Sequence, residues 1–263
     1  MKEIKNFPKT VAKNLKAVFM DIDGTLTNDG KLLAESYNAL WRLKELGLKV
    51  VPVTGRPAGW CDLIVRQWPV DGVIGENGAF AFWLENKKLK RLFHPEVASP
   101  NMKPKLDQVK KIILKEIPDS RAAAGYAYSL FDLPIDFREE EPDLGFEVAD
   151  KIKEIFEKLG ATAKVSDIHV NGWFGNYNKL AMVKLFTKHV WHKDLEANKE
   201  QYAFCGDSPN DEPMFAYFDN SIAVANISPF IAGLKSLPTY ITQSEGGLGF
   251  KEFVDIIENY KNS

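Results

Sequence analysis

Residues 18–30 of the chain read VFMDIDGTLTNDG. An apolar run stops abruptly at Asp21 and Asp23, two carboxylates separated by one residue, and no lysine or arginine stands beside them. Like charges this close repel each other, and burying them costs several kcal/mol unless something positive neutralises them. A buried strand that ends in this way predicts a cation at its tip.

Outward from this stretch, apolar runs of strand length alternate with longer segments of helical pattern. Strands are predicted over 15–20, 48–53, 71–74, 202–205, 222–225 and 240–241, and helices over 34–46, 179–191 and 250–260. Strands that are apolar throughout and alternate with helices favour a parallel sheet that is covered on both faces. The predicted fold class is therefore α/β, with a Rossmann-like core.

The middle of the chain departs from this alternation. It predicts a hairpin over 80–92, helices over 104–117 and 146–159, a strand over 122–130 and two extended pieces that run to residue 174. Strands in pairs between helices indicate an α+β insertion rather than more of the parallel sheet. We expect a core of residues 1–83 and 176–263, and an inserted module of residues 84–175.

Composition excludes several classes of function. The chain has 34 Lys+Arg against 36 Asp+Glu, a balance that argues against general affinity for nucleic acid or an anionic membrane. Cys61 and Cys205 are the only cysteines, too few for a disulfide framework or a multi-cysteine metal site. The start of the chain lacks an apolar targeting stretch. We expect a cytoplasmic monomer or homodimer with neither nucleic acid nor membrane as a partner.

Small polar or acidic residues follow four of the predicted strands. These segments are Asp21–Asp23, Thr54-Gly55-Arg56, Glu76-Asn77-Gly78 and the run CGDSPND at 205–211. Ligands of an open parallel sheet bind at the carboxyl ends of its strands, so all four segments are expected at one crevice.

Four carboxylates would then gather in this crevice: Asp21, Asp23, Asp207 and Asp211. Oxygen ligands in that number suit Mg²⁺, which typically takes one or two carboxylates together with waters and a phosphate. The Thr54 hydroxyl and the unhindered Gly55 N–H suit phosphate oxygens. Lys179, which opens a predicted helix after Asn178, would supply the positive side chain.

DIDGT at 21–25, TGR at 54–56, Lys179 and GDSPND at 206–211 resemble the four motifs of the haloacid dehalogenase superfamily. The motifs stand in that family's order and strand–loop contexts, and the resemblance covers about residues 15–83 and 176–260. An insertion after the third strand is similar to members with a large α/β cap, such as sugar-phosphate phosphatases and phosphomannomutase.

The resemblance implies a role for each acid. Asp21 would attack phosphorus and form an aspartyl-phosphate. Asp23 would protonate the leaving alkoxide and then deprotonate the attacking water. Mg²⁺ would be held by the Asp21 carboxylate, the Asp23 backbone carbonyl and Asp207, with Asp211 orienting a metal-bound water.

The remaining motif residues would bind the phosphoryl group and the substrate. Thr54 and Lys179 would hold and neutralise the transferring group, a task of positioning and charge stabilisation. The residues expected to contact phosphate or substrate are Thr54, Gly55, Arg56, Lys179 and Asn210.

Several residues keep a second interpretation. Lys179 lacks the glycine that often follows this lysine in cap-bearing relatives, and Lys184 and Lys188 compete for its role. Arg56 suits a surface ion pair as well as a substrate contact, and Glu76-Asn77 suits a structural turn.

Aromatic and imidazole side chains are ambiguous in the same way. Trp60 and Trp173 could face a sugar ring, although ordinary packing is the simpler interpretation. The four histidines, among them His169, lack metal-ligand spacing and are expected at the surface or in packing.

The sequence thus predicts a Mg²⁺-dependent phosphatase of a small phosphorylated metabolite, in particular a sugar phosphate. A phosphomannomutase-like phosphomutase is one alternative, and a non-catalytic binding module on the same fold is another. A mutase must bind a second phosphate in its cap, usually through several arginines, and the insertion holds only Arg91, Arg121 and Arg138.

Overall fold

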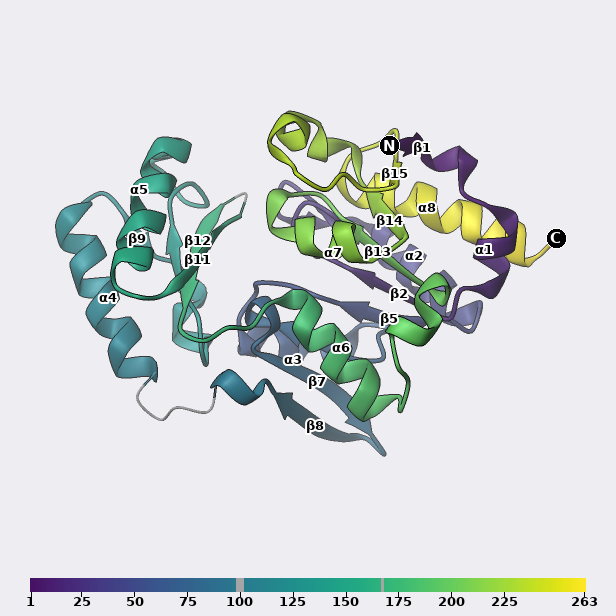
Figure 1. The fold of residues 1–263 in the computed structure, drawn as a ribbon, viewed down its shortest axis with the longest axis horizontal. Coiled ribbons are helices and arrows are strands. Elements are labelled where there is room, and N and C mark those ends of the chain that lie inside the picture. Colours follow the sequence, from purple (N-terminus) through teal and green to yellow (C-terminus); the bar gives the residue numbers. More distant parts are fainter. Residues whose placement is uncertain (98–101, 167) are drawn as a thin grey trace.

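The core of the protein is a six-stranded parallel sheet (Figure 1). The computed structural model describes residues 1–97, 102–166 and 168–263. The strands lie in the order β1 (Lys2–Glu3), β15 (Tyr240–Ile241), β14 (Asn220–Ala223), β13 (Tyr202–Gly206), β2 (Ala17–Met20) and β5 (Lys49–Pro52). The predicted α/β class is confirmed, because each pair of neighbours in this sheet is parallel.

Alternate residues of the strands feed two apolar layers, one on each face of the sheet. In β2, Val18 and Met20 enter the layer formed with α1 (Lys9–Asn14), α2 (Ala34–Glu45), α3 (Ala58–Gln67) and α8 (Gly246–Lys261). Phe19 enters the opposite layer, with α6 (Lys179–Val190) and α7 (Glu212–Tyr217). Cys61 and Cys205 are buried free thiols in the first layer.

A hairpin extends the core beyond β5. β6 (Val73–Gly75) adjoins β5 through one parallel bridge between Val53 and Ile74, and it pairs with the antiparallel hairpin of β7 (Phe80–Glu85) and β8 (Lys88–Phe93). The hairpin predicted over 80–92 is therefore confirmed. The domain boundary expected between residues 83 and 84 falls inside β7, whose buried residues pack into both core layers.

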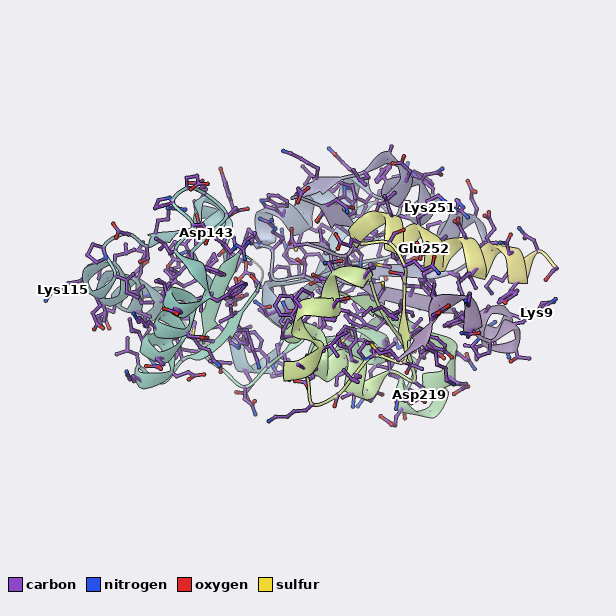
Figure 2. The ribbon with its side chains drawn as sticks, turned by 90° about the horizontal axis from the view of Figure 1, so that it is seen from above. Lys9, Lys115, Asp143, Asp219, Lys251 and Glu252 are labelled. Atoms are coloured by element: carbon purple, nitrogen blue, oxygen red, sulfur yellow. The ribbon has the colours of Figure 1, made fainter. Side chains whose placement is uncertain are left out.

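The inserted cap has its own sheet and its own apolar cluster. The antiparallel order is β11 (Thr162–Val165), β12 (His169–Trp173), β10 (Leu133–Asp136) and β9 (Arg121–Ala122). Two helices, α4 (Met102–Glu116) and α5 (Gly145–Lys158), pack against it and bury residues such as Leu106, Ile152 and Phe156. Seen from above in Figure 2, Lys115 of the cap and Lys9 of the core mark opposite ends of the molecule.

The strand predicted over 122–130 is wrong. Only Arg121–Ala122 is extended, residues Ala124–Tyr128 form the 3-10 helix η4, and strand β10 was not predicted. η4 lies against the start of α3: a Cβ on Gly59 would stand 2.9 Å from the Tyr128 Cβ. This tertiary contact decides the conformation of an apolar run that is compatible with either structure. None of the described helices is long and apolar enough to cross a membrane.

Candidate active site

The motifs that the sequence predicts to be catalytic meet because their strands are neighbours. β2 lies between β13 and β5, with Met20 in register with Cys205 on one side and Pro52 on the other. The ladder continues one residue further, since Asp21 N–H donates to Cys205 O at 2.9 Å and Val53 N–H donates to Met20 O at 2.7 Å. The three loops that follow these strands therefore open at the same edge of the sheet.

Three buried carboxylates converge at this edge. Asp21, Asp207 and Asp211 each offer an oxygen, and these three oxygens lie within 4.8 Å of one another. Asp21 is 5% exposed, Asp207 3% and Asp211 0%. Gly24, at φ 76°, makes room for them, because a Cβ there would stand 2.3 Å from Asp207 Oδ2. Three hard oxygen ligands in a small space suit a divalent cation such as Mg²⁺.

Lys179 supplies an ammonium group to this cluster. Its Nζ lies 3.0 Å from Asp21 Oδ2 and 2.7 Å from Asp211 Oδ1. The Asn178 side chain caps α6 by accepting from Ala181 N–H at 2.9 Å, which fixes the first turn that carries Lys179. The competing Lys184 and Lys188 are exposed further along the helix.

One ammonium leaves the three acids incompletely neutralised. Burial, opposed by Lys179, raises the pKa of Asp21 to about 7, and burial raises the pKa of Asp207 well above its ordinary value. Burial lowers the pKa of Lys179, but the charges of Asp21 and Asp211 outweigh it and raise that pKa overall. With three carboxylates and one ammonium, the cluster favours an added cation.

Surrounding donors fix the acids in place. Asp207 accepts from Thr25 Oγ1 at 2.9 Å and from Asn226 Nδ2 at 3.2 Å. Asp211 Oδ2 accepts from the Asp207 backbone N–H at 3.2 Å. Such outer contacts hold metal-ligating carboxylates in a defined orientation.

The fourth acid of the motifs, Asp23, has a different partner. Arg56 Nε and Nη2 donate to Asp23 Oδ2 and Oδ1, each at 2.8 Å. The sequence placed four carboxylates together, whereas the structure groups three and turns that of Asp23 toward Arg56. The Arg56 guanidinium attracts the Asp23 carboxylate through two hydrogen bonds, whereas the three other carboxylates repel it.

Other predicted residues line or support the crevice beside these acids. The fully buried Thr54 hydroxyl accepts from Arg56 N–H at 3.0 Å. Gly55 and Asn210 line the crevice, and the Asn210 side chain accepts from Ser208 Oγ at 2.7 Å.

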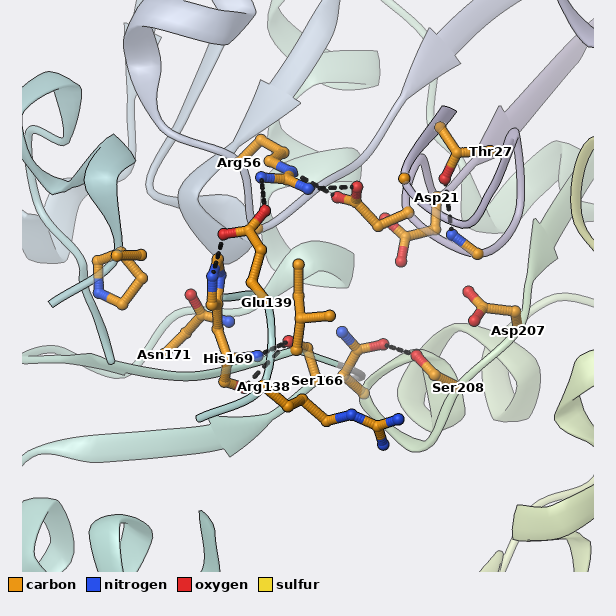
Figure 3. Close-up of a pocket in the computed structure, with 18 of the residues that line it drawn as sticks. Asp21, Thr27, Arg56, Arg138, Glu139, Ser166, His169, Asn171, Asp207 and Ser208 are labelled. Atoms are coloured by element: carbon orange, nitrogen blue, oxygen red, sulfur yellow. Dashed lines mark hydrogen bonds and ion pairs between the residues drawn. The ribbon is translucent and has the colours of Figure 1, made fainter. Parts of the chain in front are cut away.

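The crevice between core and cap has a volume of about 950 Å³ (Figure 3). Its core wall includes Asp21, Arg56 and Asp207, and its cap wall includes Glu139 and His169. The two walls of one cavity thus come from the core and from the inserted cap, which is the arrangement expected when a cap covers a ligand-binding core.

No motif in the sequence marks the cap residues that line this crevice. Glu139 Oε1 lies 3.3 Å from Arg56 Nη1, and its Oε2 lies 2.7 Å from His169 Nε2. His169 was expected at the surface or in packing, and it is 8% exposed at the crevice. The alternation of His169, Asn171 and Trp173 with small or apolar residues along β12 was the available signal, because strand side chains alternate between faces.

The two tryptophans have different environments. Trp60 lines the crevice, and the Arg56 guanidinium carbon lies 4.3 Å from the centre of its ring. Trp173 is 2% exposed and stacks on Tyr177, with ring centres 5.6 Å apart. Trp173 therefore packs the junction of core and cap.

A second acidic group, Glu76 and Asp132, lies at that junction. The Glu76 carboxylate accepts four backbone N–H groups: Ala58 at 3.0 Å, Leu130 at 2.8 Å, Phe131 at 2.5 Å and Asp132 at 3.0 Å. Three of these donors belong to the cap. The Glu76-Asn77 turn therefore holds the cap to the core.

Asp132 continues this junction. It accepts from Asn77 Nδ2 at 2.8 Å and from the Tyr177 hydroxyl at 3.4 Å. Burial raises the pKa of Glu76 and that of Asp132. Glu76 and Asn77 both have positive φ, 44° and 56°, a conformation that non-glycine residues keep only where surrounding contacts enforce it.

Comparison with known proteins identifies this architecture. A model of the family described as haloacid dehalogenase-like hydrolase matches residues 18–117 and 146–248. Phosphoglycolate phosphatase 1 of Saccharolobus solfataricus is 25% identical, over 92% of this chain and 95% of that protein. A phosphoglycolate phosphatase of Methanobrevibacter smithii is 27% identical, over 92% of this chain and 98% of that protein.

A solved structure shares the fold. The sucrose-phosphatase of Synechocystis superposes with a TM-score of 0.63 and 16% sequence identity, covering 92% of this chain and 98% of that one. At this identity the likeness concerns the fold, core and cap together.

Proposed function

Because this chain belongs to the haloacid dehalogenase-like hydrolases, we propose that it is a Mg²⁺-dependent phosphatase that hydrolyses a sugar phosphate through an aspartyl-phosphate on Asp21. The observation that carries this proposal is the cluster of three buried acids around one lysine at the strand tips. Its relatives include phosphatases of small phosphorylated metabolites.

In the proposed first step, an Asp21 oxygen attacks phosphorus and the bond between phosphorus and the ester oxygen breaks. Asp23 gives its proton to the departing alkoxide. Lys179 and Thr54 hold the transferring phosphoryl group and neutralise its charge.

In the second step, Asp23 takes a proton from water, and that water releases phosphate from Asp21. Asp21, Asp207, Asp211 and the Asp23 carbonyl would hold Mg²⁺, which when bound supplies positive charge to the phosphoryl oxygens. Arg56 donates to both oxygens of Asp23, so one of these hydrogen bonds must open before that oxygen can carry the proton.

The distribution of arginines favours a phosphatase over a phosphomutase. In the described part of the crevice wall, Arg138 is the one arginine that comes from the cap. Arg121 pairs with Asp136. Arg91 of β8 lies over the ring of Phe82 on β7. A second phosphate would find no cluster of guanidinium groups among these described residues. The intact acids and lysine weigh against a non-catalytic module.

Hydrolysis of p-nitrophenyl phosphate with and without Mg²⁺ tests the proposal. We expect Mg²⁺-dependent release of phosphate, and a fall of about a thousandfold or more in Asp21→Asn, which lacks the nucleophile. Asp62→Asn, a matched change on the exposed face of α3, is the control. Full activity of Asp21→Asn would overturn the assignment of Asp21 as the nucleophile. Conversion of a sugar 1-phosphate into a sugar 6-phosphate without release of free phosphate would favour the phosphomutase.

A further inference from the structure

A carboxylate of the cap occupies the outer side of Arg56. The inner side of this guanidinium is taken by Asp23, and its Nη1 donates to Glu139 Oε1 at 3.3 Å. The Arg56 side chain is only 12% exposed, so little of it remains available to a ligand. Arg56 is thus a cation at the catalytic acids whose charge is already shared between two carboxylates of the protein.

Glu139 is held firmly in this position. Its other oxygen lies 2.7 Å from His169 Nε2. The hydrogen bond from His169, with the nearby Arg56 charge, lowers the pKa of Glu139 to about 2, so the carboxylate stays ionised and the imidazole Nε2 must be the donor. Figure 3 shows the chain of contacts from Arg56 through Glu139 to His169.

Glu139 stands where a carboxylate of a substrate would bind. A phosphate ester of a small hydroxy acid carries its carboxylate a few ångström from the phosphoryl group, and Arg56 is the guanidinium best placed to receive it. In this chain that ligand would have to displace Glu139 or lie beside it as a like charge. Asp29, Glu140 and Glu245 also line the crevice and outnumber Arg138 of the cap wall, so they add to the repulsion.

Asn171 offers a different kind of contact on the same cap wall. It lines the crevice at 6% exposure, and its amide makes no hydrogen bond to any residue that the structure describes. Its Nδ2 would lie 3.6 Å from a Cβ on Gly55, so it reaches the phosphate-binding loop. A side-chain amide that lines a crevice both donates and accepts, as a hydroxyl does.

We infer that Glu139 is a specificity-determining residue: it imitates and so excludes a substrate carboxylate, and with Asn171 it selects phosphate esters whose leaving group is uncharged and hydroxylated. This inference rests on the proposed function. It separates this chain from the phosphoglycolate phosphatases that it resembles, because phosphoglycolate carries such a carboxylate.

Two pairs of esters test the inference, each pair differing only by CH₂OH against COO⁻. They are hydroxyethyl phosphate with phosphoglycolate, and glycerol 3-phosphate with 3-phosphoglycerate. The quantity compared is the ratio of kcat/KM for the neutral ester to that for the acidic ester, because inactive protein cancels from a ratio within one preparation.

We expect the wild-type ratio to favour the neutral ester by about tenfold or more, and Glu139→Gln to lower this ratio by at least about tenfold, the effect of one unit charge a few ångström away. Glu154→Gln, which removes a charge from the exposed face of α5, should leave the ratio unchanged. The preference should also weaken at high salt, which a purely steric effect would not do.

His169→Ala gives an independent measurement if Glu139→Gln does not fold. It removes the donor that fixes Glu139, so the ratio should fall in the same direction by a smaller factor. A wild-type preference for the acidic esters, or a ratio that both variants leave unchanged, would overturn the inference while hydrolysis itself upheld the proposed function. Failure to hydrolyse these esters and p-nitrophenyl phosphate would overturn both.

Discussion

Among the residues that the structure describes, the buried acids at the strand tips and those at the junction of core and cap are stabilised in opposite ways. Asp21, Asp207 and Asp211 at the strand tips share one ammonium, that of Lys179. Glu76 at the junction of core and cap accepts four backbone N–H groups and has no lysine or arginine among its hydrogen-bond partners. Burial raises the pKa of Asp21 and that of Glu76 alike, so the shift alone does not distinguish the two groups.

Hydrogen-bond satisfaction does distinguish them. Each Glu76 oxygen accepts two donors that come from the protein itself, so a ligand would add nothing. Asp21 and Asp207 of the strand-tip acids line the crevice, their oxygens have one protein partner each, and the three acids carry more negative charge than Lys179 can neutralise. A buried acid that the backbone saturates holds structure, and a buried acid that remains undersatisfied is suited to binding a ligand.

Removing the ammonium should have the largest effect. In Lys179→Met, the acids lose their counter-charge, and we expect the free energy of unfolding of the metal-free protein to fall by about 3–5 kcal/mol. Turnover of p-nitrophenyl phosphate should fall about a thousandfold, since the group that neutralises the phosphoryl oxygens is lost. Urea denaturation with and without Mg²⁺ measures the first effect.

Mg²⁺ should restore part of the stability of this variant but not its activity. Lys184→Met, on the exposed side of the same helix, is the control and should match the wild type. Unaltered stability of Lys179→Met would mean that the strand-tip acids need no counter-charge.

Breaking the junction should have an intermediate effect. Glu76→Gln replaces one acceptor oxygen by an NH₂ that faces two N–H donors, so we expect a loss of about 2 kcal/mol in unfolding free energy. Because the Glu76 carboxylate accepts backbone N–H groups of the junction and none from the side chains proposed to be catalytic, kcat should change far less than in Lys179→Met. Thermal denaturation measures the loss, and Glu85→Gln on the exposed end of β7 is the matched control. An equal fall in kcat for Glu76→Gln and Lys179→Met would contradict the distinction.

The dependence of stability on pH should show the smallest effect. The folded pKa of Asp21, about 7, lies above its ordinary value of 3.8, so the folded metal-free protein binds a proton that the unfolded chain releases. Stability from this group is present at low pH and is lost as pH rises through that interval. We expect wild type to lose about 1–2 kcal/mol more than Asp21→Asn between pH 5.5 and pH 8.

Saturating Mg²⁺ should reduce this loss, because the cation binds the ionised carboxylates. Chemical denaturation at the two pH values, with EDTA or Mg²⁺, provides the measurement. Identical pH profiles for wild type and Asp21→Asn would show that Asp21 does not titrate in this range.

The parallel core was predictable because each of its central strands is buried on both faces and therefore reads as an unbroken apolar run. The acids at the strand tips were predictable for the same reason, since chain order places them at one edge. The cap was less accessible to this reasoning. Pro134 within β10 interrupts the strand pattern, and the run around Gly125 became helical through a contact with Pro57 in the core.

Pairings between distant segments explain the rest. Asp23 was expected beside the other acids. In the folded protein its carboxylate bonds to Arg56 instead, which the sequence alone does not indicate. Glu139 and His169 carry no motif, and they reach the crevice because the cap folds over the core. Long-range partners of this kind leave no local pattern in the sequence.

The cap leaves and rejoins the core at nearby places, since the ring centres of His94 and Tyr177 lie 5.6 Å apart and Asn176 N–H donates to Glu96 Oε2 at 3.3 Å. A cap that meets the core at these chain crossings and at the Glu76 turn behaves as a module, provided that an exchanged cap keeps the backbone donors to Glu76. Exchanging caps among relatives would then transfer the choice of substrate, while the core of the recipient would keep the phosphoryl-transfer step. The sequences of cap and core are then free to diverge at different rates.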